Sequence, residues 1–69
     1  MNPQAHLSPR EIQLAERLAW GASVKEAAYA LSMTYKTAVN HVQNIYQKTG
    51  CNKINQLSAW WFCTRFNIS

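Results

Sequence analysis

Acidic side chains are scarce in this 69-residue chain, which has three glutamates against seven lysine and arginine residues. Charged residues make up 14% of the sequence, compared with roughly 25% in an average domain. The net charge of +4 and the isoelectric point of about 9.4 therefore rest on a few groups. A basic excess on so small a body favours a polyanionic partner such as a nucleic acid, and plain solubility is the alternative interpretation.

Long apolar runs, glycine-rich loops and metal-ligand patterns are also missing. No apolar stretch approaches the roughly 18 residues of a membrane span, and residues 1–7 lack the apolar run of a signal peptide. Cys51 and Cys63 have neither CxxC spacing nor a histidine pattern around them, and the two glycines form no phosphate-binding loop. We expect a cytoplasmic, nucleoid-associated protein without metal or cofactor. The two cysteines are interpreted as thiols, with a disulfide as the alternative.

Catalytic groups are hard to assemble from this sequence. Two of the three carboxylates, Glu11 and Glu26, each follow a serine by three residues, which is the spacing of a helix-capping box. The third, Glu16, is interpreted as a solvated surface charge. His41 has no acid or nucleophile patterned around it. We therefore do not expect an enzyme.

The first two helices have clear start signals. Ser8 fits an N-cap, Pro9 fits the first helical position, and Glu11 completes the capping box. Ser23 and Glu26 repeat the serine–glutamate spacing. The sequence therefore predicts one helix that begins after Ser8 and a second that begins after Ser23.

The third and fourth helices complete an all-α pattern. Thr34 fits the cap of a helix over about 34–49, and Gly50 ends it. Asn52 fits the cap of a fourth helix over about 53–66. The inward side of the third helix is predicted to hold Ala38, Val42, Ile45 and Thr49, and that of the fourth to hold Ile54, Leu57 and Trp61. We predict a four-helix domain over residues 7–69 after a disordered lead over residues 1–6.

A short turn at Ser32 and Met33 joins the second and third helices, so the pair predicts a helix-turn-helix. The second helix of such a motif enters the DNA major groove, where amides pair with adenine edges and a valine contacts a thymine methyl. Hydroxyls and lysines near a helix start donate to phosphates. The candidate DNA contacts are Lys25, Thr34, Tyr35, Lys36, Thr37, Val39, Asn40, Gln43, Asn44 and Lys48. An ordinary solvated helix face explains each residue singly, but the combination favours groove recognition.

Four segments resemble the LuxR-type (GerE-type) DNA-binding domain: Leu7-Ser8-Pro9-Arg10-Glu11, Gly21-Ala22-Ser23-Val24-Lys25-Glu26-Ala27-Ala28, Thr37-Ala38-Val39-Asn40-His41 and Asn44-Ile45-Tyr46-Gln47-Lys48-Thr49-Gly50. The resemblance runs without a gap from Leu7 to about Phe62. It implies a helix-turn-helix domain that binds double-stranded DNA, usually as a homodimer through its last helix. It also implies a bacterial transcription regulator, free-standing or as an output domain such as that of a response regulator.

The resemblance carries roles and departures for individual residues. It implies that Lys25 and the start of the third helix contact phosphates, and that Val39, Asn40 and Gln43 face bases. The family pattern has a lysine where this chain has Val39, an asparagine where it has Val24, and a leucine where it has Thr49. Loss of a groove lysine predicts fewer phosphate contacts and a shallow salt dependence.

The fourth helix carries three consecutive aromatic residues. Neighbouring helix positions point about 100° apart, so these rings cannot all face one core. Trp61 fits the inward side, which predicts that Trp60 or Phe62 is at least partly exposed. We interpret Trp60, Trp61, Phe62 and Phe66 as a candidate interface for a second copy or for a separate regulatory domain or protein. A thin core that spreads bulky residues around it is the alternative.

Two other functions fit parts of the pattern. One is a protein-interaction module on the same fold with weak or lost DNA binding, supported by Val39 and the aromatic fourth helix. The other is a promoter-binding domain like region 4 of sigma factors, which has a similar opening and helix-turn-helix. The segment from Asn44 to Gly50 argues against the sigma-factor interpretation.

Overall fold

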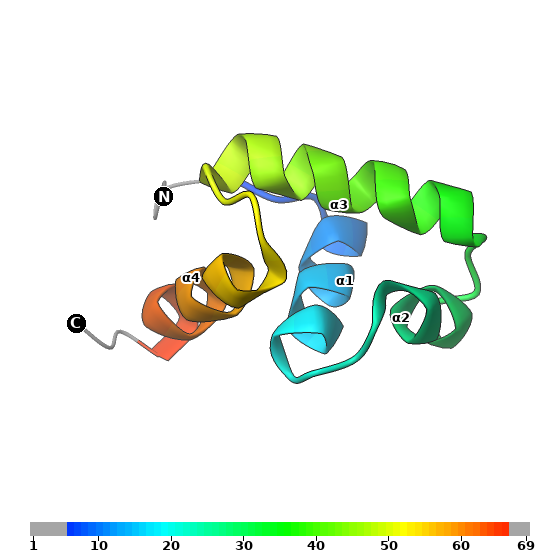
Figure 1. The fold of residues 1–69 in the computed structure, drawn as a ribbon, viewed down its shortest axis with the longest axis horizontal. Coiled ribbons are helices and arrows are strands. Elements are labelled where there is room, and N and C mark those ends of the chain that lie inside the picture. Colours follow the sequence, from blue (N-terminus) through cyan, green and yellow to red (C-terminus); the bar gives the residue numbers. More distant parts are fainter. Residues whose placement is uncertain (1–5, 67–69) are drawn as a thin grey trace.

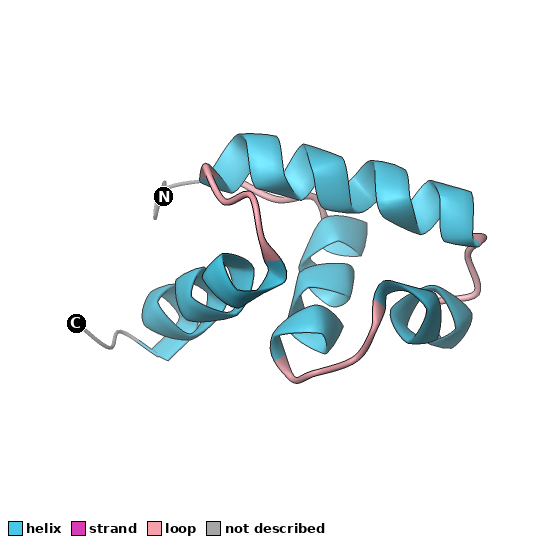
Figure 2. Cartoon of the chain, in the orientation of Figure 1, coloured by secondary structure: helices cyan, strands magenta, loops and turns pink. Residues whose placement is uncertain are grey.

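The computed structural model describes residues 6–66, with the backbone alone for residues 65 and 66. Across this range it contains four helices and no strand (Figures 1 and 2). They are α1 (Pro9–Ala19), α2 (Val24–Ala30), α3 (Tyr35–Thr49) and α4 (Ile54–Phe66). The predicted all-α, four-helix class is confirmed. The predicted disordered lead lies outside the described residues, apart from His6.

The capping residues select where the first two helices begin. At the start of α1, the Ser8 N–H donates to Oε1 of Glu11 over 2.8 Å, and the Glu11 N–H donates to Oγ of Ser8. Ser23 and Glu26 make the same reciprocal pair at the start of α2, with 2.9 Å between the Ser23 N and Oε1 of Glu26. Both boxes satisfy backbone donors that have no partner inside the helix, which confirms the two predicted starts.

The third helix begins and ends as predicted. Oγ1 of Thr34 accepts the Thr37 N–H over 3.1 Å, and Gly50 ends the helix with a left-handed φ of 78°. The inward side is also confirmed, because Ala38, Val42, Ile45 and Thr49 are all buried. The hydroxyl of buried Thr49 donates to the Ile45 carbonyl over 2.8 Å, so it costs the core no unsatisfied polar group.

Helix α1 lies at the centre of the fold and packs against the other three helices. It contributes Leu14, Ala15, Leu18 and Ala19 to a buried cluster that α2, α3 and α4 complete. Ala27 and Ala28 of α2 are almost fully buried, and their small side chains let the neighbouring helices approach closely. Helix α2 packs on α3, and a short turn joins them, so the predicted helix-turn-helix is present.

The fourth helix differs from its predicted register. It begins at Ile54, and the Leu57 N–H donates to the Lys53 carbonyl over 3.0 Å, so Lys53 rather than Asn52 precedes the first helical residue. The Asn52 N–H instead donates to Oε1 of Gln56 over 2.9 Å. Ile54 was expected inside but is 36% exposed at the first position of the helix, where the core has not yet begun.

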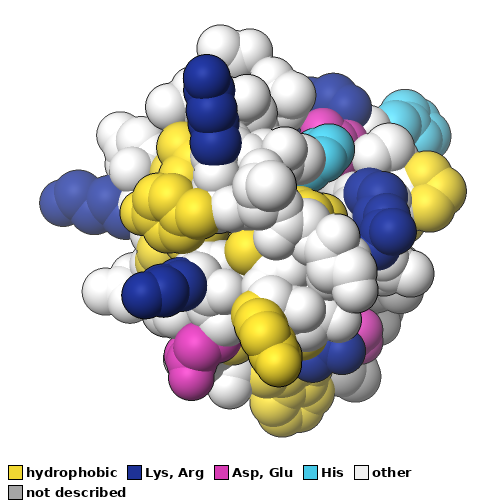
Figure 3. Space-filling model, turned by 90° about the vertical axis from the view of Figure 1, so that its right-hand side faces the viewer, with side chains coloured by type: hydrophobic (Ala, Val, Ile, Leu, Met, Phe, Trp, Pro, Cys, Tyr) yellow, Lys and Arg dark blue, Asp and Glu magenta, His cyan; other side chains and the backbone are white. Residues whose placement is uncertain are grey.

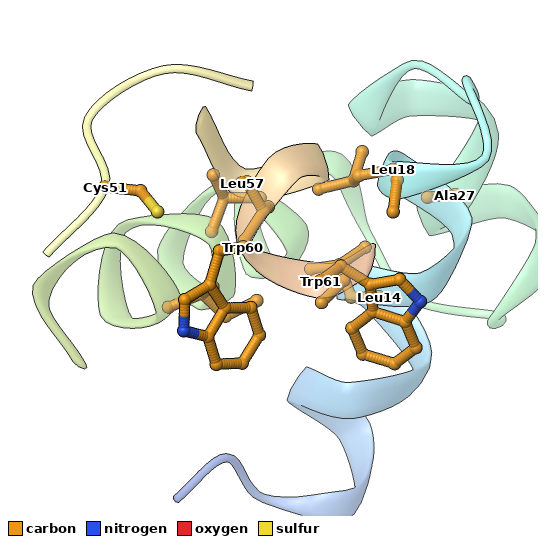
Figure 4. Close-up of a cluster of buried hydrophobic side chains, with 11 residues drawn as sticks. Leu14, Leu18, Ala27, Cys51, Leu57, Trp60 and Trp61 are labelled. Atoms are coloured by element: carbon orange, nitrogen blue, oxygen red, sulfur yellow. The ribbon is translucent and has the colours of Figure 1, made fainter. Parts of the chain in front are cut away.

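Trp60 and Trp61 both point into the core, where they lie beside Leu14 and Leu57 (Figure 4). They are only 5% and 3% exposed. The prediction that they form a partner surface is therefore wrong: α4 packs mainly on α1 but also touches α3, and this wider contact covers two neighbouring helix positions. Phe62 is half-buried, and the side chain of Phe66 lies outside the described residues.

Candidate nucleic-acid interface

Within residues 6–66, the outward side of α3 is exposed along its length. Figure 1 shows α3 along the top of the molecule, with the other helices on its opposite side. Its buried stripe faces those helices, and a polar row stands directly opposite at spacings of four, three and four residues. That row is Lys36, Asn40, Gln43 and Gln47, with Asn44 beside it, and all five side chains are exposed. Val39 lies on the flank of the row and is half-buried.

Two hydroxyls are linked at the start of α3. The Thr34 hydroxyl donates to Oγ1 of Thr37 over 2.9 Å, while the same Thr34 oxygen accepts the Thr37 N–H. Thr37 therefore keeps its own hydroxyl proton to donate elsewhere. Both side chains are exposed. This end of α3 offers hydrogen-bond donors together with the positive end of the helix dipole, the combination that anions favour.

Lys25 lies near the same end of α3. It lines an open recess together with Ser23, Val24 and Tyr35. The recess joins the start of α2 to the start of α3, although the residues on its two sides are ten or more positions apart in the sequence. Tyr35 is 59% exposed there. The structure thus brings Lys25 and Tyr35, both predicted site residues, to one place.

Lys48 has a different environment. Its Nζ donates to Oε1 of Glu11 over 2.7 Å, an ion pair across 37 residues that joins α3 to the start of α1. Burial opposes ionisation of Glu11, but the hydrogen bonds from Lys48 and the Ser8 backbone outweigh it and lower the pKa of this carboxyl. Lys48 therefore stabilises the fold, and we do not include it among the proposed DNA contacts.

The remaining charge is dispersed. Figure 3 shows lysine and arginine side chains at separate points of the face that includes the start of α3, with few acidic groups between them. Residues 6–66 contain no group of three or more histidine, cysteine or acidic residues that could hold a metal ion. Among the described helices, none is long and apolar enough to cross a bilayer. Any attraction that this surface exerts on a polyanion comes from individual side chains.

Comparison with known proteins identifies the relatives of this fold. Residues 5–60 match the family described as bacterial regulatory proteins, luxR family. The chain belongs to this family. Membership confirms the predicted resemblance and supports a function in DNA-binding transcription regulation. The family is not an enzyme family.

Two curated relatives match most of this LuxR-family chain. The probable HTH-type transcriptional regulator GfsR of Streptomyces halstedii is 37% identical over 60 residues, which is 87% of this chain and 25% of GfsR. The transcriptional regulatory protein UhpA of Escherichia coli K12 is 39% identical over 59 residues, which is 86% of this chain and 30% of UhpA. The chain thus spans less than a third of either relative. No solved structure matches the chain as significantly as these two relatives do.

Within the described residues, the most exposed aromatic side chains of this LuxR-family domain are Trp20, Tyr29 and Tyr35, and none of them belongs to the predicted partner surface. Trp20, at the end of α1, is 66% exposed and meets half-buried Phe62 edge-on, with ring centroids 5.1 Å apart. Tyr29 is 89% exposed on α2, and it was not among the residues that the sequence indicated as candidate contacts. Its position four residues after Lys25 on α2 is the signal that marks it, because that spacing puts both side chains on one side of the helix.

Proposed function

We propose that this chain is a sequence-specific double-stranded DNA-binding domain of a bacterial transcription regulator and that α3 lies in the major groove. The observation that carries the proposal is the uncovered polar row on α3, the second helix of a helix-turn-helix. A polar helix face that is only solvated does not need to belong to a helix-turn-helix. Family membership and the similarity to the transcriptional regulators GfsR and UhpA support the same function.

The proposed contacts fall into two classes. Thr34, Tyr35, Lys36 and Thr37, together with Lys25 across the recess, contact phosphates and set the position of the domain on the duplex. Val39, Asn40, Gln43 and Asn44 face base edges. The phosphate contacts come from the first turn of α3 and from α2, and the base contacts come from the next two turns.

Fluorescence anisotropy with labelled duplexes tests the proposal. Lys36→Ala is expected to weaken binding to all duplexes by a similar factor, because a phosphate contact carries no sequence information. Asn40→Ala is expected to change the preferred sequence more than the general affinity. Lys53→Ala is the matched control, since Lys53 is an exposed lysine just before α4. Absence of salt-dependent binding to any duplex at low salt would overturn the proposal in favour of a protein-interaction module.

We also propose that two copies pair through the outer side of α4. Trp60 and Trp61 do not take part, because they are buried. The outer side instead carries Asn55, Ala59 and Cys63, which are exposed and small enough for two helices to approach closely. Pairing would place two α3 helices on half-sites about 34 Å apart. Sedimentation of Ala59→Glu against wild type tests it, and a wild-type chain that stays monomeric on a two-site duplex would contradict it.

The regulatory input is proposed to come from outside this domain. The chain spans 25% and 30% of the two relatives, so their remaining length is where such input would reside in proteins of that kind. We propose a cytoplasmic output domain controlled by a regulatory domain or protein, as in a response regulator. Limited proteolysis of the natural protein, followed by DNA binding of the fragments, distinguishes an attached regulatory domain from a separate partner.

A further inference from the structure

The chemistry of the polar row on the outward side of α3 changes along the helix. Its first member, Lys36, is a cation in the first helical turn, and every later member is an amide. Asn40, Gln43 and Gln47 follow one another at spacings of three and four, with Asn44 beside them. From Lys36 to Gln47 the row covers about 16 Å at 1.5 Å per residue, roughly the height of five base pairs.

From this row we infer that the domain selects a half-site whose central base pairs are A·T. This inference rests on the proposed function and adds the class of DNA sequence. An asparagine or glutamine makes paired hydrogen bonds with N6 and N7 of adenine, because its amide offers one acceptor and one donor side by side. Asn40 and Gln43 occupy the middle of the exposed row, where a groove-bound helix comes closest to the bases.

Recognition of guanine requires a different kind of side chain. Its O6 and N7 are both acceptors, and the side chains that pair with them are arginine and lysine. Helix α3 contains no arginine, and its two lysines are Lys36 and Lys48. Lys36 stands at the helix start, where we place it on a phosphate, and Lys48 stands in the last turn, paired with Glu11. The middle of α3 therefore presents no cation to a G·C pair.

Val39 extends the preference to the other strand. It flanks Asn40 on the groove side of α3 and is half-buried, so its methyl groups are held in place by the packing beneath them. An apolar side chain in the major groove gains from contact with the thymine C5 methyl, a group that a G·C pair lacks. Valine beside asparagine thus suits an A·T step better than a G·C step.

Selection from a random duplex library at low salt, followed by anisotropy on single duplexes, tests the inference. The expected result is a bound pool enriched in A·T at two or more adjacent positions. Replacing one of these pairs with G·C is expected to weaken binding about tenfold. Gln43→Arg is expected to convert one selected position from A·T to G·C, because arginine is the guanine reader.

Gln13→Arg is the matched control, since it makes the same glutamine-to-arginine change on the exposed side of α1. It is expected to strengthen binding to all duplexes alike and to leave the selected sequence unchanged. Salt-dependent binding with a G·C-selected centre, or with no base preference, would overturn this inference and leave DNA binding intact. No binding to any duplex would overturn the proposed function itself, and this inference with it.

Discussion

Glu11 combines two tasks at the scale of a single residue. Its carboxylate accepts the Ser8 N–H as a capping partner and also pairs with Lys48 from α3, so it joins the beginning of the first helix to the end of the third. Glutamine at this position keeps the first interaction and loses the charge of the second. The two contributions are therefore separable by substitution and by pH.

We predict that Glu11→Gln lowers the free energy of unfolding by about 1 kcal/mol at neutral pH, because Lys48 is partly exposed and the pair is screened by solvent. The folded pKa of Glu11 is lowered, so its stabilising effect is complete above the ordinary glutamate pKa and disappears as the pH falls through the lower folded value. Urea unfolding followed by tryptophan fluorescence should show wild type and variant converging in acid. Glu16→Gln, at an exposed site, is the control, and a gap that stayed constant with pH would contradict the assignment.

Ser32 is the residue of the helix-turn-helix turn with an unfavourable backbone. Its φ is 56°, a left-handed conformation that costs an L-residue roughly 1–2 kcal/mol. We predict that Ser32→Gly raises the free energy of unfolding by up to about 1 kcal/mol, because glycine removes the strain but adds freedom to the unfolded chain. Thermal unfolding checks this, with Ser58→Gly inside α4 as a control that should destabilise by a similar amount. A loss of stability in Ser32→Gly would show that the turn needs the serine side chain.

At the scale of helices, the sequence predicted what local chemistry determines. Ser8, Ser23 and Thr34 cap their helices through contacts three residues away, so their patterns are readable without a fold. The inward stripe of α3 was predictable for the same reason, since one helix face meets one core. The Lys48–Glu11 pair was not, because no local rule links positions 37 residues apart.

The buried side of α4 is wider than a single helical stripe predicts. A narrow stripe admits Trp61 and excludes Trp60, but α4 contacts both α1 and α3 and buries both rings. The exposed residues of α3 could be predicted from the sequence, because they lie opposite the buried stripe of the same helix. Lys25 and Tyr35 share a recess only because α2 packs on α3, and sequence spacing does not reveal that.

We predict that Trp60→Ala and Trp61→Ala each destabilise the domain by about 3–5 kcal/mol, since each removes a large buried ring and leaves a cavity. A domain of this size has a total stability of only about 3–10 kcal/mol, so either variant should be largely unfolded on modest heating. Phe62→Ala, at a half-buried position, should cost clearly less. Far-UV circular dichroism against temperature makes the comparison, and a Trp60→Ala chain as stable as wild type would return this residue to the surface.

For the whole molecule, the arrangement of helices and the small number of cations act together. Helices α1, α2 and α4 hold α3 with one side buried and the other open (Figure 1), and the open side brings few charges to the proposed interface. The net charge of +4 is spread over separate side chains. Binding by such a surface should depend more on hydrogen bonds with bases, and less on released counterions, than binding by a strongly basic domain.

The salt dependence of DNA binding is where this balance is measured. We predict that Val39→Lys, which restores the lysine of the LuxR-type pattern, tightens binding at low salt and steepens the slope of log K against log salt by about 0.9, the effect of one added phosphate contact. The long lysine stem can cover the half-buried site of Val39 while its ammonium reaches the duplex. Gln13→Lys adds the same charge at an exposed site on α1 and should change the slope much less. Equal slopes for the two lysine variants, measured by anisotropy titrations across salt concentrations, would mean that DNA does not approach the α3 side selectively.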